Sequence, residues 1–415
     1  MSWSDLKVFA PHTKSVFEEL SKQSELPVLD AIPTYLNIVD CRLNSDAWSI
    51  ELDRIDSRTG ISNREVLLRY VLSRAIVDQG SDITGVEMWH SRLFERCYKD
   101  DIRVLHNAAD FVSNYAKVLS IGVEVRDEVV IERAQVWADQ KKSKTRNKNS
   151  YTLFNVDGQR GGKQAHWFMS ARLLPALLLA DSKPGGLTEL VFGNMTTETP
   201  IKMSRRLRSD PVFGLGWCIG DKACDLFSKW AIGTFRLATG IANAWDPANS
   251  PLPMDQRIGR LMIRFGFMDE FFGVSRMMEK KQFGFNPDDN QARPAPKSGD
   301  IPLGRWYLHV MDFRRQASVR KGPPTDWLSG EWKSQGGVGK IPKSFKPQDV
   351  ISILCKSMNQ ELGTTMTPVE LDDQLMGLGG EVCTDDSPKC TACDLATTCQ
   401  ANTDSMKANL KYCYT

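Results

Sequence analysis

Four cysteines near the end of the chain constrain its fold more than any other feature. They follow the spacing Cys383-x6-Cys390-x2-Cys393-x5-Cys399, and only one pair has the close C-x-x-C separation. An iron–sulfur cluster takes four soft thiolates from one tight, irregular loop, whereas structural zinc sites usually use two close pairs. The spacing therefore favours an iron–sulfur cluster over a zinc site, and a pair of disulfides is the third alternative.

The composition is that of a multidomain protein without a membrane segment. A chain of 415 residues is too long for one compact domain, so two or three domains are expected. Met1–Lys7 lacks the basic and apolar regions of a signal peptide, and the longest apolar run, Leu173–Ala180, is far too short to span a bilayer. We expect a cytoplasmic monomer with no membrane partner, in which the ten cysteines serve metal binding or catalysis rather than disulfides. The net charge of only +2 excludes a broad basic coat for nucleic acid.

The hydrophobic pattern predicts an all-α protein. Apolar residues recur at helical spacing from Ser62 and Asn63 up to a turn at Asp78. A second helix follows, and residues 102–140 continue the helical pattern. Strict alternation of apolar and polar residues, the mark of a half-buried strand, is almost absent. The expected buried face of the second helix consists of Val86, Trp89, Leu93 and Phe94.

Three segments have no clear role. Residues 1–60 carry no motif, and residues 141–165 form a basic insertion that suits either DNA contact or a solvated surface loop. Residues 276–344 form a second insertion, whose first part is rich in Pro, Asn, Asp and Gly. Its later part interleaves basic and aromatic residues, which suit phosphate contact and base stacking but also the core of a small subdomain.

Two further motifs precede the cysteines in the chain. The stretch 217–227 reads WCIGDKACDLF and follows a basic run, Lys202–Arg208. A glycine-containing turn between two helices exposes backbone N–H groups to a DNA phosphate. The stretch 253–266 reads PMDQRIGRLMIRFG. Together with the cysteine loop, these motifs resemble the endonuclease III branch of the helix-hairpin-helix DNA glycosylases over roughly residues 62–275 and 345–400.

The resemblance implies a catalytic lysine in the hairpin. Lys222 stands at the position of the family's lysine after the second hairpin glycine, Gly220, and the small residues that follow at 231 and 233 agree with this register. The chain departs from the family at Cys218, which replaces the first hairpin glycine. A second register, which uses the glycines at 214 and 216, would put Cys218 itself at the lysine position.

The resemblance also implies a catalytic carboxylate, Asp255. It would open a helix, where the helix dipole stabilises its charge, and the long gap after Lys222 implies an insertion at 236–250. Cleavage of a glycosidic bond builds positive charge on the sugar, which a carboxylate beside C1′ stabilises. A lysine amine that attacks C1′ forms a Schiff base and so permits strand cleavage. Taken singly, Lys222 could be a phosphate ligand and Asp255 a helix cap.

DNA contacts are expected from the hairpin, from nearby arginines and from the turn after Asp78. In the family this turn inserts into the base stack when the target base flips out, and Gln79 is the candidate for that role, with a plain capping turn as the alternative. The other expected DNA-binding residues are Gly220, Arg205, Arg206 and Arg257. The expected ligands of a [4Fe–4S] cluster, which in the family serves structure and DNA contact, are Cys383, Cys390, Cys393 and Cys399.

The expected fold is therefore the two-lobed helix-hairpin-helix glycosylase fold. One lobe would comprise residues 61–84 and 226–400 with the cluster loop at 383–399, and the other a helical barrel at 85–225 with the hairpin at about 209–232. The expected activity is excision of a damaged or modified base from double-stranded DNA, as in base-excision repair, with AP-lyase activity through Lys222. The alternatives are a monofunctional glycosylase that uses Asp255 and water, a non-catalytic iron–sulfur DNA-binding protein, and a zinc protein.

Overall fold

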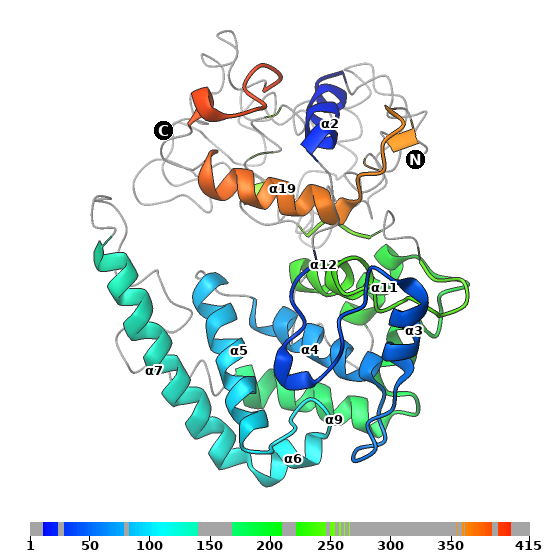
Figure 1. The fold of residues 1–415 in the computed structure, drawn as a ribbon, viewed down its shortest axis with the longest axis vertical. Coiled ribbons are helices and arrows are strands. Elements are labelled where there is room, and N and C mark those ends of the chain that lie inside the picture. The colour runs from blue at the N-terminus through cyan, green and yellow to red at the C-terminus, as the bar shows by residue number, and fades with distance from the viewer. Residues whose placement is uncertain are drawn as a thin grey trace, which may run out of the picture. The chain divides into compact units, whose positions relative to one another are not determined.

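The chain forms two units, which are described separately. The computed structural model describes residues 11–23, 29–78, 83–139, 168–209, 221–245, 250–253, 257, 258, 261, 265, 355, 359, 360, 362–383 and 389–399. Unit 1 comprises Met1–Val28 and Pro247–Thr415, and unit 2 comprises Leu29–Asp246 (Figure 1). Within the described residues the structure is helical, and its only β pairing is an isolated bridge between Ile55 and Ser62. The all-α class predicted from the sequence is confirmed.

Helix α4 (Asn63–Val77) is the centre of unit 2. The Ser62 side chain caps its first turn by accepting the N–H of Glu65, and Asp78 follows its last residue. Every residue of α4 except Arg74 is buried, because neighbours surround it on all sides. These neighbours are α3 (Ser45–Asp53), α5 (Ile83–Lys99), α10 (Gly186–Phe192) and α12 (Asp221–Lys229). The helix predicted to run from Ser62–Asn63 to Asp78 is confirmed at both ends.

Helices α5 and α7 (Tyr115–Asp139) lie side by side in unit 2 (Figure 1). The predicted apolar face of α5 is confirmed, since Val86, Trp89, Leu93 and Phe94 are each 1% exposed. Salt bridges from Arg92 and Arg96 of α5 to α7 lie outside this apolar contact. On the other side of the unit, α6 (Ala108–Ser113) packs on α9 (Leu174–Ser182), which follows a π-helical turn, η4 (Phe168–Leu173).

Residues 29–60, which carry no motif in the sequence, are an integral part of unit 2. They contain the short helix η2 (Thr34–Leu36) and α3, and their side chains bond to the backbone of residues 234–236. Buried Arg42 donates to the Thr234 carbonyl at 2.8 Å, and the Trp48 indole donates to the Phe235 carbonyl at 3.2 Å. Because an unpaired buried carbonyl is costly, these side chains fix the course of the chain after α12.

Unit 1 contains α2 (Pro11–Gln23), α19 (Pro368–Glu381) and the short helix η9 (Cys390–Ala392). A capping box begins α19, because Thr367 accepts the N–H of Glu370 while the Glu370 carboxylate accepts the N–H of Thr367. This reciprocal pair satisfies two backbone donors that the first helical turn would otherwise leave unpaired. The helix therefore has a well-defined start and leads directly to Cys383.

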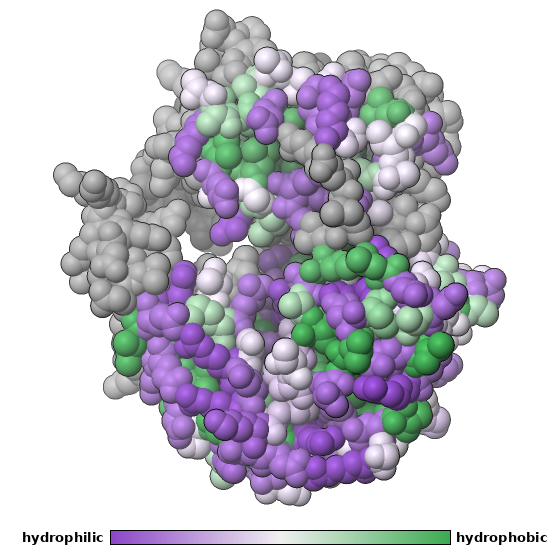
Figure 2. All heavy atoms as spheres, in the orientation of Figure 1, coloured by the Kyte–Doolittle hydropathy of each residue, from purple (hydrophilic) through white to green (hydrophobic). Residues whose placement is uncertain are grey.

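The surface of unit 2 is mainly hydrophilic, with apolar side chains exposed around α3 (Figure 2). Val39 and Leu43 before α3 and Ile50 within it are between 61% and 79% exposed. Nevertheless, α3 is anchored, since Trp48 and Leu52 are fully buried. None of the described helices combines the length and the apolar character that a bilayer crossing requires.

Candidate active site

Lys222 lies in the first turn of α12, beside the residue that ends α4. Its Nζ atom is 3.4 Å from Oδ2 of Asp78, and both residues belong to unit 2. The Lys222 side chain is 32% exposed, whereas that of Asp78 is only 10% exposed. The structure thus presents the predicted nucleophile partly to solvent, with a mostly buried carboxylate at its amine.

The packing of α11 (Pro200–Ser209) against α12 positions this lysine. Asp225 on α12 is fully buried and accepts hydrogen bonds from Ser204 Oγ and an Arg205 guanidinium nitrogen, both at 2.7 Å. Asp225 lies three residues after Lys222, and residues at this separation are neighbours on a helix. This buried contact between α11 and α12 therefore fixes the orientation of α12 about its own axis. The direction in which the Lys222 side chain leaves the helix is fixed in the same way.

Asp78 is held in an environment that favours its protonated form. Burial raises its pKa above the ordinary aspartate value, while the Lys222 ammonium opposes this shift through its charge and its hydrogen bond. Glu87 on α5 raises the pKa further and Arg74 lowers it. Asp78 Oδ1 is buried and has no hydrogen-bond partner among the residues that the structure describes. This carboxyl group can therefore accept a proton more readily than a solvated aspartate.

The positive charge of Arg74 is already engaged. Its guanidinium forms salt bridges with Asp30 and, at 2.8 Å, with Glu87, and it lies 4.5 Å from the centre of the Trp230 ring. Trp230 begins η6 (Trp230–Thr234), the π-helical turn that follows α12. Arg74 thus ties the end of α4 to η6, to α5 and to the segment before η2. Asp78 relies on Lys222 for its nearest cation.

Buried His90 on α5 is not a suitable proton carrier. Its Nε2 atom shares a hydrogen bond of 2.7 Å with Ser73 Oγ, and burial lowers its pKa to about 3. It therefore stays neutral at physiological pH and serves the packing between α4 and α5.

The structure brings together only part of the predicted site. Gln79, Gly220 and Asp255 lie outside the described residues, so their predicted roles stay predictions. Arg257, two residues after Asp255, is exposed, and a Cβ atom added at Gly380 would lie 3.7 Å from its guanidinium. Within unit 1, Arg257 therefore lies next to α19.

The two arginines of α11 that were predicted to bind DNA have partners within the protein. Arg205 binds Asp225, and the guanidinium of Arg206 binds Glu198, with its closest contact at 2.8 Å. Their side chains are 24% and 23% exposed. A DNA phosphate at these arginines would have to share them with these carboxylates.

The four predicted cluster ligands lie on one short, folded segment after α19. None of the four forms a disulfide, and Cys383 is buried while the others are partly buried. The N–H of Lys389 donates to the carbonyl of Val382 at 2.9 Å, which brings η9 back to the end of α19. Burial raises the pKa of the Cys393 thiol, and the thiols of Cys383 and Cys390 are close enough to raise it further. Neighbouring cysteines that form no disulfide suit an iron–sulfur cluster, although no three metal-binding side chains in the described residues converge to hold a single ion.

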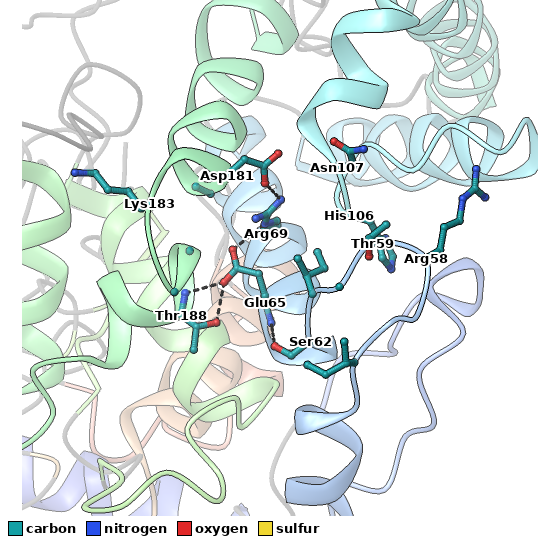
Figure 3. Close-up of a pocket in the computed structure, with 16 residues that line it drawn as sticks. Arg58, Thr59, Ser62, Glu65, Arg69, His106, Asn107, Asp181, Lys183 and Thr188 are labelled. Carbon is teal, nitrogen blue, oxygen red and sulfur yellow. Dashed lines mark hydrogen bonds and ion pairs between the residues drawn. The ribbon is translucent and has the colours of Figure 1, made fainter.

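A pocket of about 600 Å³ lies at the other end of α4 (Figure 3). Glu65 at its floor accepts the N–H groups of Leu187 and Thr188 and a guanidinium N–H of Arg69, at 2.8–2.9 Å. Burial lowers the pKa of the pocket's His106 to about 4. The polar groups of Glu65 at the floor of the pocket are thus already paired. Asp78, beside Lys222, lies 13 residues after Glu65, and at 1.5 Å per helical residue the pocket is about 20 Å from Lys222. We do not regard this pocket as the binding site for a base.

Searches against models of protein families, curated proteins and solved structures find no match to this chain. The site must therefore be interpreted from its own geometry and chemistry.

Sequence reasoning missed two acidic residues of this site. Asp78 was considered only as the start of a turn, and its contact with Lys222, 144 residues away, has no local signal. Asp225 did have a signal, because it is a charged residue between the buried Cys224 and Leu226 on α12. An aspartate on an otherwise apolar stretch predicts a buried polar partner.

Proposed function

We propose that this protein is a DNA glycosylase with AP-lyase activity, which flips a damaged or modified base out of double-stranded DNA and cleaves its N-glycosidic bond. The observation that carries the proposal is the position of Lys222. Its amine lies at the start of α12, partly exposed, beside Asp78, which follows α4 and directly precedes Gln79 in the chain. A partly exposed lysine amine can act as the nucleophile at C1′ once the target base has flipped out.

The reaction assigns a distinct task to each residue. The neutral amine of Lys222 attacks C1′, the glycosidic bond breaks, and the base leaves with the bonding electrons and takes up a proton. Asp255 would stabilise the positive charge that develops on the sugar. The C1′–O4′ bond of the sugar then breaks, O4′ takes up a proton from the attached amine, and an iminium ion forms at C1′. This iminium ion acidifies C2′–H, so that loss of that proton expels the 3′-phosphate and cleaves the strand.

The cysteine segment would hold a [4Fe–4S] cluster through Cys383, Cys390, Cys393 and Cys399. Such a cluster would order the end of unit 1 and contribute to DNA contact, and it takes no part in bond cleavage. The support for this assignment is four cysteines that form no disulfide, together with the Lys389–Val382 hydrogen bond that brings η9 back to the end of α19.

Trapping of the Schiff base tests the proposal. The full chain is incubated with duplex DNA that contains one abasic site, and borohydride reduces any imine to a stable adduct, visible on a denaturing gel. We expect an adduct with the wild type and none with Lys222→Gln. Lys183→Gln is the matched control, since Lys183 lies at the pocket near the opposite end of α4, and it should trap normally.

The outcomes separate the alternative functions. An adduct that survives Lys222→Gln would place the nucleophile elsewhere. If the wild type forms no adduct but releases modified bases, and Asp255→Asn abolishes that release, the protein is a monofunctional glycosylase. If it binds duplex DNA but neither traps nor releases a base, it is a non-catalytic DNA-binding protein.

A further inference from the structure

We infer that Asp78 is a proton-accepting, positioning residue for Lys222, whose carboxylate takes the proton that the lysine must lose before it attacks. This inference rests on the proposed lyase function and deepens it. It adds to the site a carboxylate that is separate from Asp255. This carboxylate belongs to unit 2 and lies where α4 ends.

The geometry is that of a direct proton transfer. Lys222 Nζ donates a long hydrogen bond of 3.4 Å to Oδ2 of Asp78, and a modest movement of the lysine would shorten it. Oδ1 of Asp78 is buried and has no hydrogen-bond partner among the described residues, so hydrogen bonds that would stabilise the anion are few.

The surrounding charges favour the transfer. The charged groups that act on Asp78 are Lys222 from α12, Glu87 from α5 and Arg74 from its own helix. Arg74 is itself shared between Glu87 and Asp30. The two cations, Lys222 and Arg74, therefore interact with the three carboxylates of Asp78, Glu87 and Asp30. His90 on α5 is neutral and adds no charge. A proton on Asp78 relieves the excess negative charge in a site where burial also penalises the anion.

The proton balance closes over the reaction with an abasic site. The Lys222 ammonium gives one proton to Asp78, which leaves a neutral amine and a neutral carboxyl group. The amine adds to the C1′ aldehyde, and the carboxyl group returns its proton to the oxygen that leaves as water. The products are an iminium ion at Lys222, one water molecule and an Asp78 carboxylate, so the net charge is unchanged.

This transfer has a distinctive pH dependence. The reactive form, with a neutral amine and a protonated Asp78, holds the same number of protons as the ion pair. Its population is therefore independent of pH between the two macroscopic pKa values of the pair. Without Asp78 the lysine must release its proton to solvent, and the trapping rate should then rise about tenfold per pH unit until the lysine itself titrates.

The test compares the single-turnover trapping rate of the wild type and Asp78→Asn across about pH 6 to 9. The reductant is cyanoborohydride, and the substrate is duplex DNA with one abasic site. We expect a flat profile for the wild type. For Asp78→Asn we expect a rate about 10²-fold lower near pH 7, a rise with pH, and a gap that closes near pH 9.

Two variants keep the test independent of folding defects. Asp78→Glu retains a carboxylate and should keep the flat profile at a reduced rate. Glu87→Gln removes one of the acids that favour the transfer but keeps the Asp78 carboxylate, so its rate should fall while its profile stays flat. Parallel profiles for the wild type and Asp78→Asn, differing only in height, would overturn the inference while the lyase function stands. Absence of any adduct from the wild type would overturn the proposed function, and the inference with it.

Discussion

Asp225 shows how much a single buried residue can determine at this site. Its carboxylate is fully buried on α12 and joins that helix to Ser204 and Arg205 of α11. Removal of one partner from a buried ion pair is costly, because the remaining charged or polar groups lose their compensation. The connection therefore supports both the stability of unit 2 and the direction of Lys222.

We predict that Asp225→Ala lowers the free energy of unfolding by about 3 kcal/mol. Urea unfolding followed by circular dichroism measures this loss. Glu132→Ala is the matched control, because it breaks the exposed salt bridge between α7 and Arg92 at a helical position and should leave the unfolding midpoint nearly unchanged. Equal midpoints for the two variants would contradict the structural role assigned to Asp225.

At the scale of elements, the start of α10 depends on a side chain from another helix. Glu65 of α4 accepts the N–H groups of Leu187 and Thr188, which the first turn of α10 leaves unpaired. Gly186 makes this approach possible, since its φ is +58° and a Cβ atom there would lie 2.6 Å from Oε1 of Glu65. The glycine and the glutamate thus form one structural feature, although 121 residues separate them.

Gly186→Ala is therefore predicted to destabilise the protein more than Gly60→Ala. Gly60 also has a positive φ, +73°, but no atom lies within 4 Å of the position its Cβ would occupy. The Gly60 variant measures backbone strain alone, about 1 kcal/mol, whereas the Gly186 variant adds a collision with a buried carboxylate. Thermal unfolding of the two variants tests the order, and equal midpoints would show that Glu65 yields without loss.

The sequence predicted elements better than it predicted the contacts between them. The ends of α4 and the buried face of α5 followed from capping residues and apolar spacing, which are local properties. The partners of Arg205 and Asp78 did not, because they are decided by the packing of α11, α12 and α4. Residues 29–60 were left without a role for the same reason, since their polar anchors bind a backbone segment nearly 200 residues away.

At the scale of the whole molecule, the division into two units separates the cysteine segment from the core around α4. All four cluster cysteines belong to unit 1, whereas Lys222 and Asp78 belong to unit 2. Since cluster binding contributes free energy only to the part of the chain that folds around it, its loss should act on the two units unequally.

We predict about four iron atoms per chain in anaerobically purified protein, and their loss in Cys383→Ser. Scanning calorimetry of that variant should show one unfolding transition lowered or lost while a second is retained. Cys41→Ser is the matched control, since Cys41 is a free, partly buried cysteine of unit 2, and both its iron content and its transitions should be those of the wild type. Zinc in place of iron in the purified protein would identify the alternative metal site.

Arg42 and Trp48 bond to the backbone at 234–236, and this contact limits how the protein can be divided. A chain shortened from its N-terminus to the first recognisable motif, near Ser62, would lose both side chains and the Asp30 that balances Arg74. The backbone that follows α12 would then be left with unpaired carbonyls, and the packing that supports Lys222 on α12 would be weakened. The smallest fragment that preserves the chemistry near Lys222 therefore begins no later than Leu29, well before any residue that the sequence marks as functional.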